Sequence, residues 1–201
     1  MNSVTYFLGL TGGIATGKST VSQMFKDKNI PVVDADVIAR SVVTPESPVL
    51  AGLVDAFGQT ILTPDHELDR KALGQIVFND DQARERMNAI YRPYLRKAID
   101  AQLREAAKQS ELVVGDIPLL FEANYQDVFD GVAVVTVDVA TQRKRLMARN
   151  QLSQEAADKR IKAQMPLADK VKRADYVIDN QESVAHTKSQ VDHLIKQLSM
   201  V

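Results

Sequence analysis

The sequence predicts an α/β fold in which strands and helices alternate around an open sheet. The first observation is a strand, loop and helix in succession, where the apolar run Val4 to Leu10 precedes the glycine-rich stretch Gly12 to Thr20. The second is that apolar runs with the length of short buried strands recur along the chain. They occupy residues 30–34, 111–116, 132–137 and 175–179. The third is that helical periodicity fills the intervals between them, so one compact α/β unit is expected.

Length and composition restrict the function classes. The chain has 201 residues, of which 45% are hydrophobic and 25% charged, as in ordinary globular proteins. A net charge of −1 argues against a surface built to hold nucleic acid, so small molecules are the expected partners. The absence of cysteine excludes disulfides and thiol catalysis and fits a cytoplasmic location. No apolar run approaches the roughly 20 residues that span a bilayer, and the histidines are too scattered to predict a metal site.

The stretch Gly12 to Thr20 fits the phosphate-binding pattern G-x-x-x-x-G-K-[ST] in full. The backbone N–H groups of such a loop, together with the positive end of the helix that follows, bind phosphate oxygens. We expect Lys18 to reach the β- and γ-phosphates of ATP and the Ser19 hydroxyl to bind Mg²⁺. Every residue of the loop is a candidate ATP contact: Gly12, Gly13, Ile14, Ala15, Thr16, Gly17, Lys18, Ser19 and Thr20.

Two carboxylates, Asp34 and Asp36, follow the second predicted strand. Because open α/β sheets bind ligands at the carboxyl ends of their strands, this is an expected position for chemistry. The two side chains would point to the same side if the strand continued through both. Asp36 is the candidate general base for a hydroxyl acceptor, and a compatible alternative is that it caps the helix beginning at Val37. Asp34 is expected in a supporting role, as a partner of that site or of a magnesium-bound water.

The stretch from Val37 to Lys108 is mainly helical in pattern and interrupts the alternation of strands, as an inserted acceptor-binding element would. Helices are predicted over 47–57 and from Leu68 onward, and Pro93 is expected to break a helix or to begin one. Asn88 and Arg92 are four residues apart and would share a helical face. There they either contact a polar substrate or are simply solvated.

Two further segments carry charges suited to phosphate chemistry. Asp116 ends the third predicted strand, where it either holds a magnesium-bound water near Ser19 or is an ordinary turn residue. Arg145 and Arg149 are four residues apart on a helix predicted over 141–150, and such cations suit a lid that closes over a phosphoryl group. The alternative is a basic surface patch. A helical pattern capped by Ser153 and ended by Pro166 follows, and an amphipathic helix is predicted over 184–198.

Taken together, these residues resemble the dephospho-CoA kinase family nearly end to end. The resemblance rests on LTGGI at 10–14, VDAD at 33–36 with IAR at 38–40, IPLLFE at 117–122, RLMARN at 145–150, QMPL at 164–167 and ADYVIDN at 174–180. It implies a three-layer P-loop kinase fold with a five-stranded parallel sheet. It further implies a single kinase unit with a core at 1–36, 109–148 and 171–201, a helical CoA-binding insertion at 37–108 and a helical lid at 149–170.

The implied reaction is ATP-dependent phosphorylation of the ribose 3′-hydroxyl of dephospho-CoA, which yields coenzyme A and ADP in the final step of coenzyme A biosynthesis. It would use Mg²⁺, involve neither nucleic acid nor membrane, and be carried out by a monomer or weak homo-oligomer. Pattern and resemblance together give catalytic residues Lys18, Asp36 and Arg145, further ATP contacts Arg149 and Asn180, substrate contacts Asp36, Arg40, Asn88, Pro118 and Leu119, and metal ligands Ser19 and Asp116.

Two positions depart from the pattern common in that family. Ala15-Thr16 stands where Gly-Ser is frequent, so position 15 must tolerate a Cβ atom. Arg92-Pro93 stands where His-Pro is frequent, so no role is carried over to Arg92.

Two other functions remain open from the sequence. One is a kinase for a different small hydroxyl or a nucleoside monophosphate. The other is a P-loop switch protein, whose guanine-binding form would need an N-K-x-D motif that the sequence lacks. Asp55 to Gly58 matches a loose D-x-x-G string but lies in a predicted helical stretch, so it is attributed to chance.

Overall fold

The computed structural model describes residues 5–78 and 80–199. The chain divides into two compact units. The first contains Met1–Asp34 and Gln102–Val201, and the second contains Ala35–Ala101. Each unit has its own apolar core.

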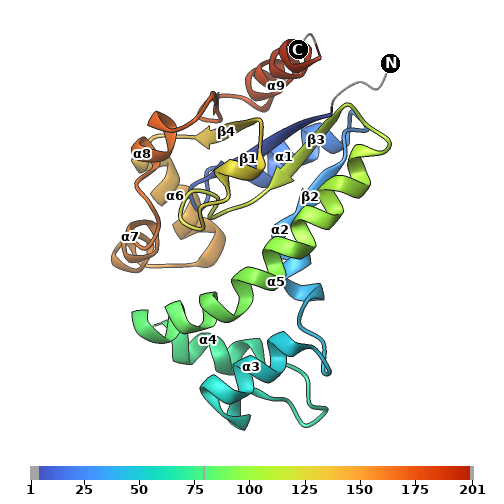
Figure 1. Ribbon diagram of the computed structural model, residues 1–201. Helices are drawn as coiled ribbons and strands as arrows, with labels where there is room; N and C mark the ends of the chain where they lie inside the picture. The colour runs from blue at the N-terminus through green and yellow to red at the C-terminus, as the bar shows by residue number, and fades with distance from the viewer. Residues whose placement is uncertain (1–4, 79, 200–201) are drawn as a thin grey trace. The chain divides into compact units, whose positions relative to one another are not determined.

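The first unit is built on a five-stranded parallel sheet with the strand order β2, β3, β1, β4, β5 (Figure 1). The strands are β1 Tyr6–Gly12, β2 Val32–Asp34, β3 Leu112–Asp116, β4 Gly131–Thr136 and β5 Tyr176–Asp179. All five predicted strands are present, and the expected α/β fold with a parallel sheet is confirmed. Val4, the first residue of the predicted β1 run, lies outside the described residues. Because β1 pairs with β3 on one side and β4 on the other, the loop that follows it lies at the middle of the carboxyl edge.

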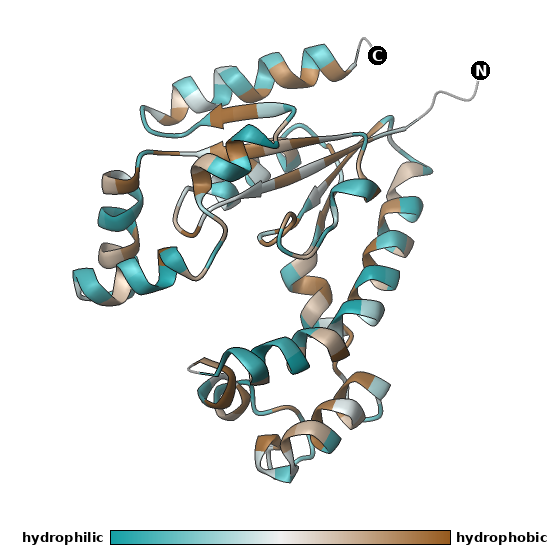
Figure 2. Cartoon of the chain, turned by 60° about the vertical axis from the view of Figure 1, so that its left-hand side comes forward, coloured by the Kyte–Doolittle hydropathy of each residue, from teal (hydrophilic) through white to brown (hydrophobic). Residues whose placement is uncertain are grey.

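Two helices, α1 (Lys18–Lys26) and α9 (Val184–Leu198), pack apolar residues on one face of the sheet. Phe25 of α1 and Val191 of α9 are fully buried in the same core as the leucines and valines of the strands. Figure 2 shows hydrophobic and hydrophilic residues alternating along α9, as expected for a helix with one buried face. The bounds of α9 are those that its periodicity predicts.

On the other face of the sheet, the aromatic ring of Phe129 packs against the backbone of β1 and β3. A Cβ atom on Gly115 would lie 2.4 Å from the Phe129 ring, and one on Gly9 would lie 2.9 Å from it. Because both positions are glycine, Phe129 packs directly over the centre of β1 and β3. The contact is at Gly115, one residue before Asp116, whose buried carboxylate lies at the end of β3.

Three shorter helices follow β4: α6 Val139–Asn150, α7 Gln154–Lys162 and α8 Leu167–Lys172. The predicted Ser153 cap is confirmed, since its hydroxyl accepts a hydrogen bond from the backbone N–H of Ala156 over 3.2 Å. The expectation for Pro166 is wrong in part. α7 has already ended at Lys162, and Pro166 is the residue from which α8 begins. Its fixed φ angle suits a helix start, and the sequence analysis did not predict α8.

The second unit is helical, as its pattern predicts. Its elements are α2 Ala35–Ser41, α3 Pro48–Phe57, the 3₁₀ turn η1 Gln59–Ile61, α4 Arg70–Phe78 and α5 Asp81–Ala107, of which the last residues belong to the first unit. Ser47 caps α3 by accepting a hydrogen bond from the Leu50 N–H over 3.1 Å. Leu53 and Ile61 are fully buried at the centre of the core of this unit.

Pro93 neither breaks nor begins a helix, which corrects the prediction. It lies inside α5, a helix of 27 residues. A proline in a helix interior removes one hydrogen bond and costs about 3 kcal/mol. The helix continues because it packs residues on both sides of the proline: Ala83 before it and Ile99 after it are each 1% exposed.

Asp34 and Asp36 do not lie on one strand. β2 ends at Asp34 and α2 begins at Ala35, so the condition under which the two side chains would share a side is not met. The predicted helix start at Val37 is two residues late, and Asp36 lies inside the first turn of α2 and not at its cap. A carboxylate in this position is favoured by the positive end of the helix.

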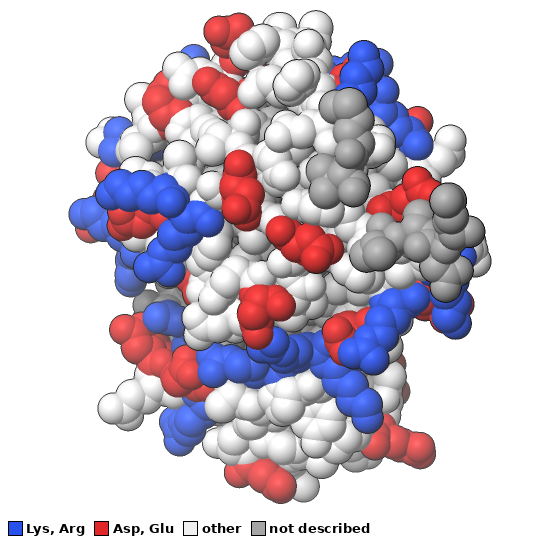
Figure 3. Space-filling model, turned by 45° about the horizontal axis from the view of Figure 1, so that its top comes forward, with Lys and Arg blue, Asp and Glu red and all other residues white. Residues whose placement is uncertain are grey.

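The surface carries both signs of charge. Figure 3 shows lysine and arginine side chains beside aspartate and glutamate side chains over the face drawn, in keeping with the net charge of −1. Within residues 5–78 and 80–199, no helix has both the length and the apolar character needed to cross a membrane.

Candidate active site

The glycine-rich loop joins the end of β1 to the start of α1 at Lys18. Ala15 and Gly17 are in the left-handed region, with φ angles of 61° and 90°. Between them, the N–H and the hydroxyl of Thr16 both donate to the Gly13 carbonyl, over 3.2 and 2.9 Å. A turn of this kind directs successive N–H groups toward one point and forms an anion-binding nest. The loop can therefore bind a phosphate group.

The two loop residues with left-handed φ angles, Ala15 and Gly17, differ in whether the site has room for a Cβ atom. Ala15 keeps its Cβ atom at a φ of 61°, so the departure from glycine is accommodated at a backbone strain of about 1 kcal/mol. Gly17 has no such freedom, because a Cβ atom there would lie 2.0 Å from Nδ2 of Asn180. It would also lie 3.9 Å from the Arg145 guanidinium, so both side chains border the loop at this point.

Lys18 and Asp116 form an ion pair in which the two side chains are 17% and 5% exposed. Asp116 ends β3, and Asp34 at the end of β2 is its neighbour in the sheet register. The carboxyl ends of three adjacent strands thus bring the loop lysine and two carboxylates to one edge. This set can bind phosphate through the cation and Mg²⁺ through carboxylate oxygen.

Asn180, the residue after β5, is 8% exposed and connects three elements. Its side-chain amide donates to the Thr16 carbonyl over 2.8 Å, and its side-chain oxygen accepts from the Thr187 hydroxyl of α9 over 2.9 Å. Its main-chain carbonyl accepts from Arg145 of α6 over 3.0 Å. The structure therefore brings Arg145 and Asn180 together with the phosphate-binding loop.

Two glutamines that the sequence analysis did not select hold the loop at Ile14. Nε2 of Gln142 donates to the Ile14 carbonyl over 2.9 Å, and Oε1 of Gln164 accepts from the Ile14 N–H over 2.8 Å. Gln142 precedes Arg145 by one helical turn on α6, a spacing that could have pointed to it. Gln164 stands in one of the quoted motifs, but nothing local to it indicates a contact 150 residues away.

Lys170 is a further residue that sequence reasoning missed. Its side chain on α8 is 0% exposed, and its ammonium lies among oxygens of the loop and of the segment after β3. Lysines are almost never fully buried unless paired, so a sequence gives no reason to place one in the interior.

Several predicted contacts lie at the surface of the first unit. Ser19 and Thr20 are exposed on the first turn of α1. The Pro118 carbonyl accepts from the Thr11 hydroxyl over 3.0 Å, and the neighbouring Leu119 is 43% exposed. Arg149 is exposed and donates to the side chain of Asn150 over 2.9 Å.

Three other predicted residues, Asp36, Arg40 and Asn88, belong to the second unit. Asp36 is exposed in the first turn of α2, and Arg40 lies in the last turn of the same helix. Asn88 is half-buried on α5. Arg92, four residues further along α5, forms an ion pair with Glu85 at 3.3 Å.

The start of α6 carries a perturbed carboxylate. The pKa of Asp138 is held below its ordinary value, first because its carboxylate accepts the backbone N–H of Thr141 over 2.6 Å. The positive charge of Arg145 acts in the same direction. Since Asp138 caps the helix that presents Arg145 to the loop, the ionised form of Asp138 supports the site.

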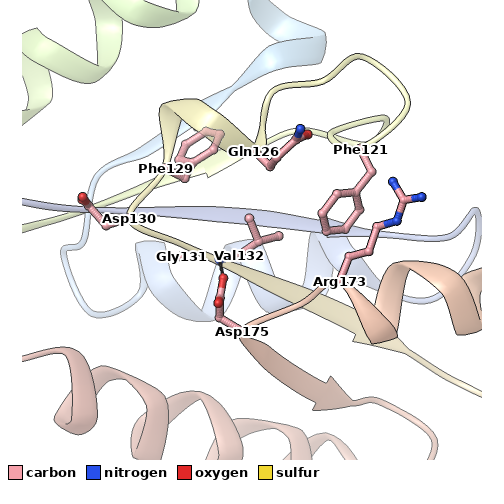
Figure 4. A pocket seen from close by; sticks show the side chains of 8 residues that line it. All are labelled: Phe121, Gln126, Phe129, Asp130, Gly131, Val132, Arg173 and Asp175. Carbon is pink, nitrogen blue, oxygen red and sulfur yellow. Dashed lines mark hydrogen bonds between the residues drawn. The ribbon is translucent and has the colours of Figure 1, made fainter.

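Among the described residues of the first unit, two pockets differ in their position relative to the phosphate-binding loop. One of about 390 Å³ is at the amino ends of β4 and β5, where Phe121, Phe129 and Arg173 line it and Asp175 accepts from the Val132 N–H over 2.8 Å (Figure 4). Because the strands are parallel, this pocket is at the edge of the sheet opposite the phosphate-binding loop. The other, about 630 Å³, adjoins the loop.

That second pocket is a groove between α1 and α9. Ser19 and Thr20 line it at the end nearest the loop, and Val184 and Lys188 of α9 line its other side. The groove therefore reaches the first turn of α1, next to the phosphate-binding loop.

The chain matches a family model described as dephospho-CoA kinase over residues 6–186. A curated relative of that name from Enterococcus faecalis is 49% identical over 194 residues, which cover 96% of this chain and 98% of the relative.

Two solved structures are similar over nearly the whole chain. A protein from Thermus thermophilus superposes with a TM-score of 0.81 at 30% identity, covering 97% of this chain and 98% of that one. A dephospho-CoA kinase from Campylobacter jejuni superposes with a TM-score of 0.73 at 29% identity, covering 96% of this chain and 97% of that one.

Proposed function

The chain belongs to the dephospho-CoA kinase family, and from this we propose that it phosphorylates the ribose 3′-hydroxyl of dephospho-CoA with ATP. The products are coenzyme A and ADP, so the reaction is the last step of coenzyme A biosynthesis. The family match confirms the resemblance drawn from the sequence motifs. The structural observation that carries the proposal is the phosphate-binding loop from Gly12 to Thr20, with Lys18 at the start of α1.

The transfer has a simple balance of bonds. The bond between the γ-phosphorus and the bridging oxygen to the β-phosphate breaks, and a bond from the 3′-oxygen to the γ-phosphorus forms. ADP leaves with the bridging oxygen, and the hydroxyl proton passes to Asp36. Such a reaction requires mainly positioning and neutralisation of charge.

The first unit supplies the donor side. Backbone N–H groups of the loop and the positive end of α1 bind the phosphates, and Lys18 neutralises the β- and γ-phosphates. Arg145, which borders Gly17, adds a second cation that acts on the γ-phosphoryl group. Asn180 holds the loop at Thr16, and Arg149 extends the basic side of α6.

The residues present fit a magnesium ion. Ser19 offers a hydroxyl oxygen and Asp116 a carboxylate oxygen, which are ligands that Mg²⁺ prefers. In the part of the chain that the structure describes, no group of three or more His, Cys, Asp or Glu residues is arranged to hold a metal. Mg²⁺ bound by one or two protein oxygens characteristically takes its other ligands from substrate phosphates and water. When bound, the ion neutralises charge on those phosphates.

The second unit supplies the acceptor side. Asp36 is the general base, and Arg40 and Asn88 contact dephospho-CoA. From the first unit, Pro118 and the exposed Leu119 contact the same substrate. We assign the insertion at 37–108 to binding of the CoA moiety and the segment 149–170 to a lid that excludes water during transfer.

A panel of acceptors tests this function. Purified chain is incubated with ATP, Mg²⁺ and, in turn, dephospho-CoA, nucleoside monophosphates and small hydroxyl compounds, and ADP release is measured. The proposal requires dephospho-CoA to be the preferred acceptor by at least about 100-fold in kcat/KM, because a site that hydrogen-bonds its substrate rejects analogues without those groups by more than an apolar pocket does. Faster turnover with another acceptor would overturn the assignment.

The protein is further proposed to act in the cytoplasm as a monomer or weak homo-oligomer. Sedimentation velocity over a range of protein concentrations tests the second statement. A species that stays dimeric or larger at nanomolar concentration would contradict it.

A further inference from the structure

The buried ammonium of Lys170, on α8, contacts the phosphate-binding loop and the segment after β3. Nζ donates to the Gly12 carbonyl over 3.1 Å and to the Pro118 carbonyl over 3.3 Å. It also forms an ion pair with Glu122 at 2.8 Å, and the side chain is 0% exposed. Three oxygens thus surround a group that has three N–H donors, so its hydrogen-bonding capacity is met.

The partners of Lys170 belong to the two sides of the proposed reaction. Gly12 ends β1 and is the first residue of the phosphate-binding loop. Pro118 belongs to the segment after β3 and precedes the exposed Leu119. One cation is therefore bonded to the backbone where the donor site begins and to the backbone next to the proposed acceptor contacts.

Glu122 ties the same cation to the end of the proposed lid. Its Oε1 accepts the N–H of Met165 over 3.0 Å as well as pairing with Lys170. The adjacent Gln164 accepts from the Ile14 N–H of the loop. The chain from Gln164 to Lys170 is in this way fixed to both the loop and the segment after β3.

We infer that Lys170 is a positioning residue for phosphoryl transfer, which fixes the phosphate-binding loop at Gly12 relative to the acceptor segment at Pro118. This inference rests on the proposed function. Catalytic groups must be held within about 0.5 Å of the productive geometry. A displacement of about 1 Å can lower turnover by about 100-fold. Lys170 acts on that geometry through the backbone and touches neither substrate.

If Lys170 only stabilises the fold, restoring stability should restore kcat. If Lys170 positions the loop, kcat should stay low. Lys170→Met and the same variant combined with Glu122→Gln distinguish these two roles. Lys170→Met keeps the length of the side chain but leaves Glu122 unpaired, so the protein is destabilised. Adding Glu122→Gln removes that unpaired charge and keeps Oε1 for the Met165 N–H. The double variant therefore regains part of the lost thermal stability, while the Gly12 and Pro118 carbonyls still lack their shared donor.

Steady-state kinetics on the folded variants, with ATP and dephospho-CoA, give the test. We expect kcat of the double variant to be about 100-fold below that of the unmodified chain, with the KM for ATP changed less than about threefold. Glu122→Gln alone leaves the ammonium without its counter-ion, so it lowers the melting temperature, but it keeps the ammonium on both carbonyls and stays within about threefold in kcat. Lys172→Met, an exposed control on the same helix, leaves kcat unchanged.

Two outcomes overturn the inference. A double variant whose kcat returns together with its melting temperature would make Lys170 a stabilising residue only. A folded Glu122→Gln variant that loses about 100-fold in kcat would assign the effect to the ion pair and not to the carbonyl contacts. If the unmodified chain yields no coenzyme A, the proposed kinase function is wrong. That outcome is seen before any variant is tested, so it is distinguishable from a failure of the Lys170 inference.

Discussion

The side-chain amide of Asn180 donates a hydrogen bond to the main-chain carbonyl of Thr16 over 2.8 Å. These residues are 164 positions apart in the chain, and the bond fixes the loop after β1 to the end of β5. Arg145 donates to the carbonyl of the same asparagine. One residue at a strand end thus determines both the shape of the phosphate-binding loop and the position of the cation beside it.

Asn180→Ala removes two buried hydrogen bonds and leaves the Thr16 carbonyl and the Thr187 hydroxyl without these partners. Each loss costs about 1 to 3 kcal/mol, so the free energy of unfolding falls by a few kcal/mol. The loosened loop raises the KM for ATP. Denaturant unfolding and ATP titration measure the two effects.

Thr187→Val is the matched control, because it breaks the network on the side away from the loop. It should lower stability by about 1 kcal/mol and leave the KM for ATP nearly unchanged. An equal rise in the KM for ATP in both variants would show that Asn180 has no direct effect on the loop.

Gly17→Ala should abolish ATP binding, because its Cβ atom would lie 2.0 Å from Nδ2 of Asn180. Gly58→Ala is the control for backbone strain alone, since Gly58 also has a positive φ, 80°, but nothing lies within 4 Å of an added Cβ atom. With a ψ of 174°, Gly58 is in a region that is almost exclusive to glycine, so the control is expected to lose about 1 to 3 kcal/mol of stability and no activity. Calorimetric ATP binding by folded Gly17→Ala at normal affinity would contradict the described loop geometry.

Asp36→Asn should lower kcat by about 100-fold to 10,000-fold, because the amide cannot accept the hydroxyl proton. The residue is exposed in the first turn of α2, where losing the negative charge costs about 0.3 to 1 kcal/mol, so the fold and ATP affinity are retained. Asp55→Asn, at an exposed position of α3 in the same unit, is the control and should have normal kcat. Normal turnover of Asp36→Asn would remove Asp36 from the role of base.

The stability of α6 should depend on pH through Asp138. Its pKa is lower in the folded protein than in the unfolded chain, mainly because of the Thr141 N–H, so its ionised form is stabilising. That contribution is complete above the ordinary aspartate pKa of about 4 and is lost as the pH falls through the lower folded value.

Asp138→Asn keeps a capping side chain but cannot ionise. The unmodified chain should therefore have the higher melting temperature at pH 7, and the difference should shrink below about pH 4. Melting curves of both proteins at a series of pH values check this. A difference that is constant or grows in acid would contradict the role of the carboxylate.

Elements with strong local patterns could be predicted from the sequence. The five strands are short apolar runs, three of which (β2, β3 and β5) end in Asp, and α9 is amphipathic over its whole length. The phosphate-binding loop was predicted because its chemistry depends on residues adjacent in the chain. Pro93 was misread because a local rule for proline was outweighed by tertiary packing on both sides of it.

The rest of the site depends on contacts between distant residues. Gln142 meets Ile14 across 128 positions, and Lys170 meets Gly12 across 158. Helical spacing places Gln142 on the same face as Arg145 but does not indicate its partner Ile14, and the short helix α8 that carries Lys170 has too few residues to show a periodicity. The wider lesson is that the sequence predicts which groups bind phosphate, while the structure identifies the residues that hold those groups in place.

The most direct test of the account is the structure of the product formed by the unmodified chain from ATP, Mg²⁺ and dephospho-CoA. Phosphorus NMR with mass spectrometry determines where the new phosphate is attached. The account predicts a single new phosphomonoester on the ribose 3′-oxygen, formed in equal amount to ADP. ADP release without that ester, or a phosphate on any other oxygen, would contradict it.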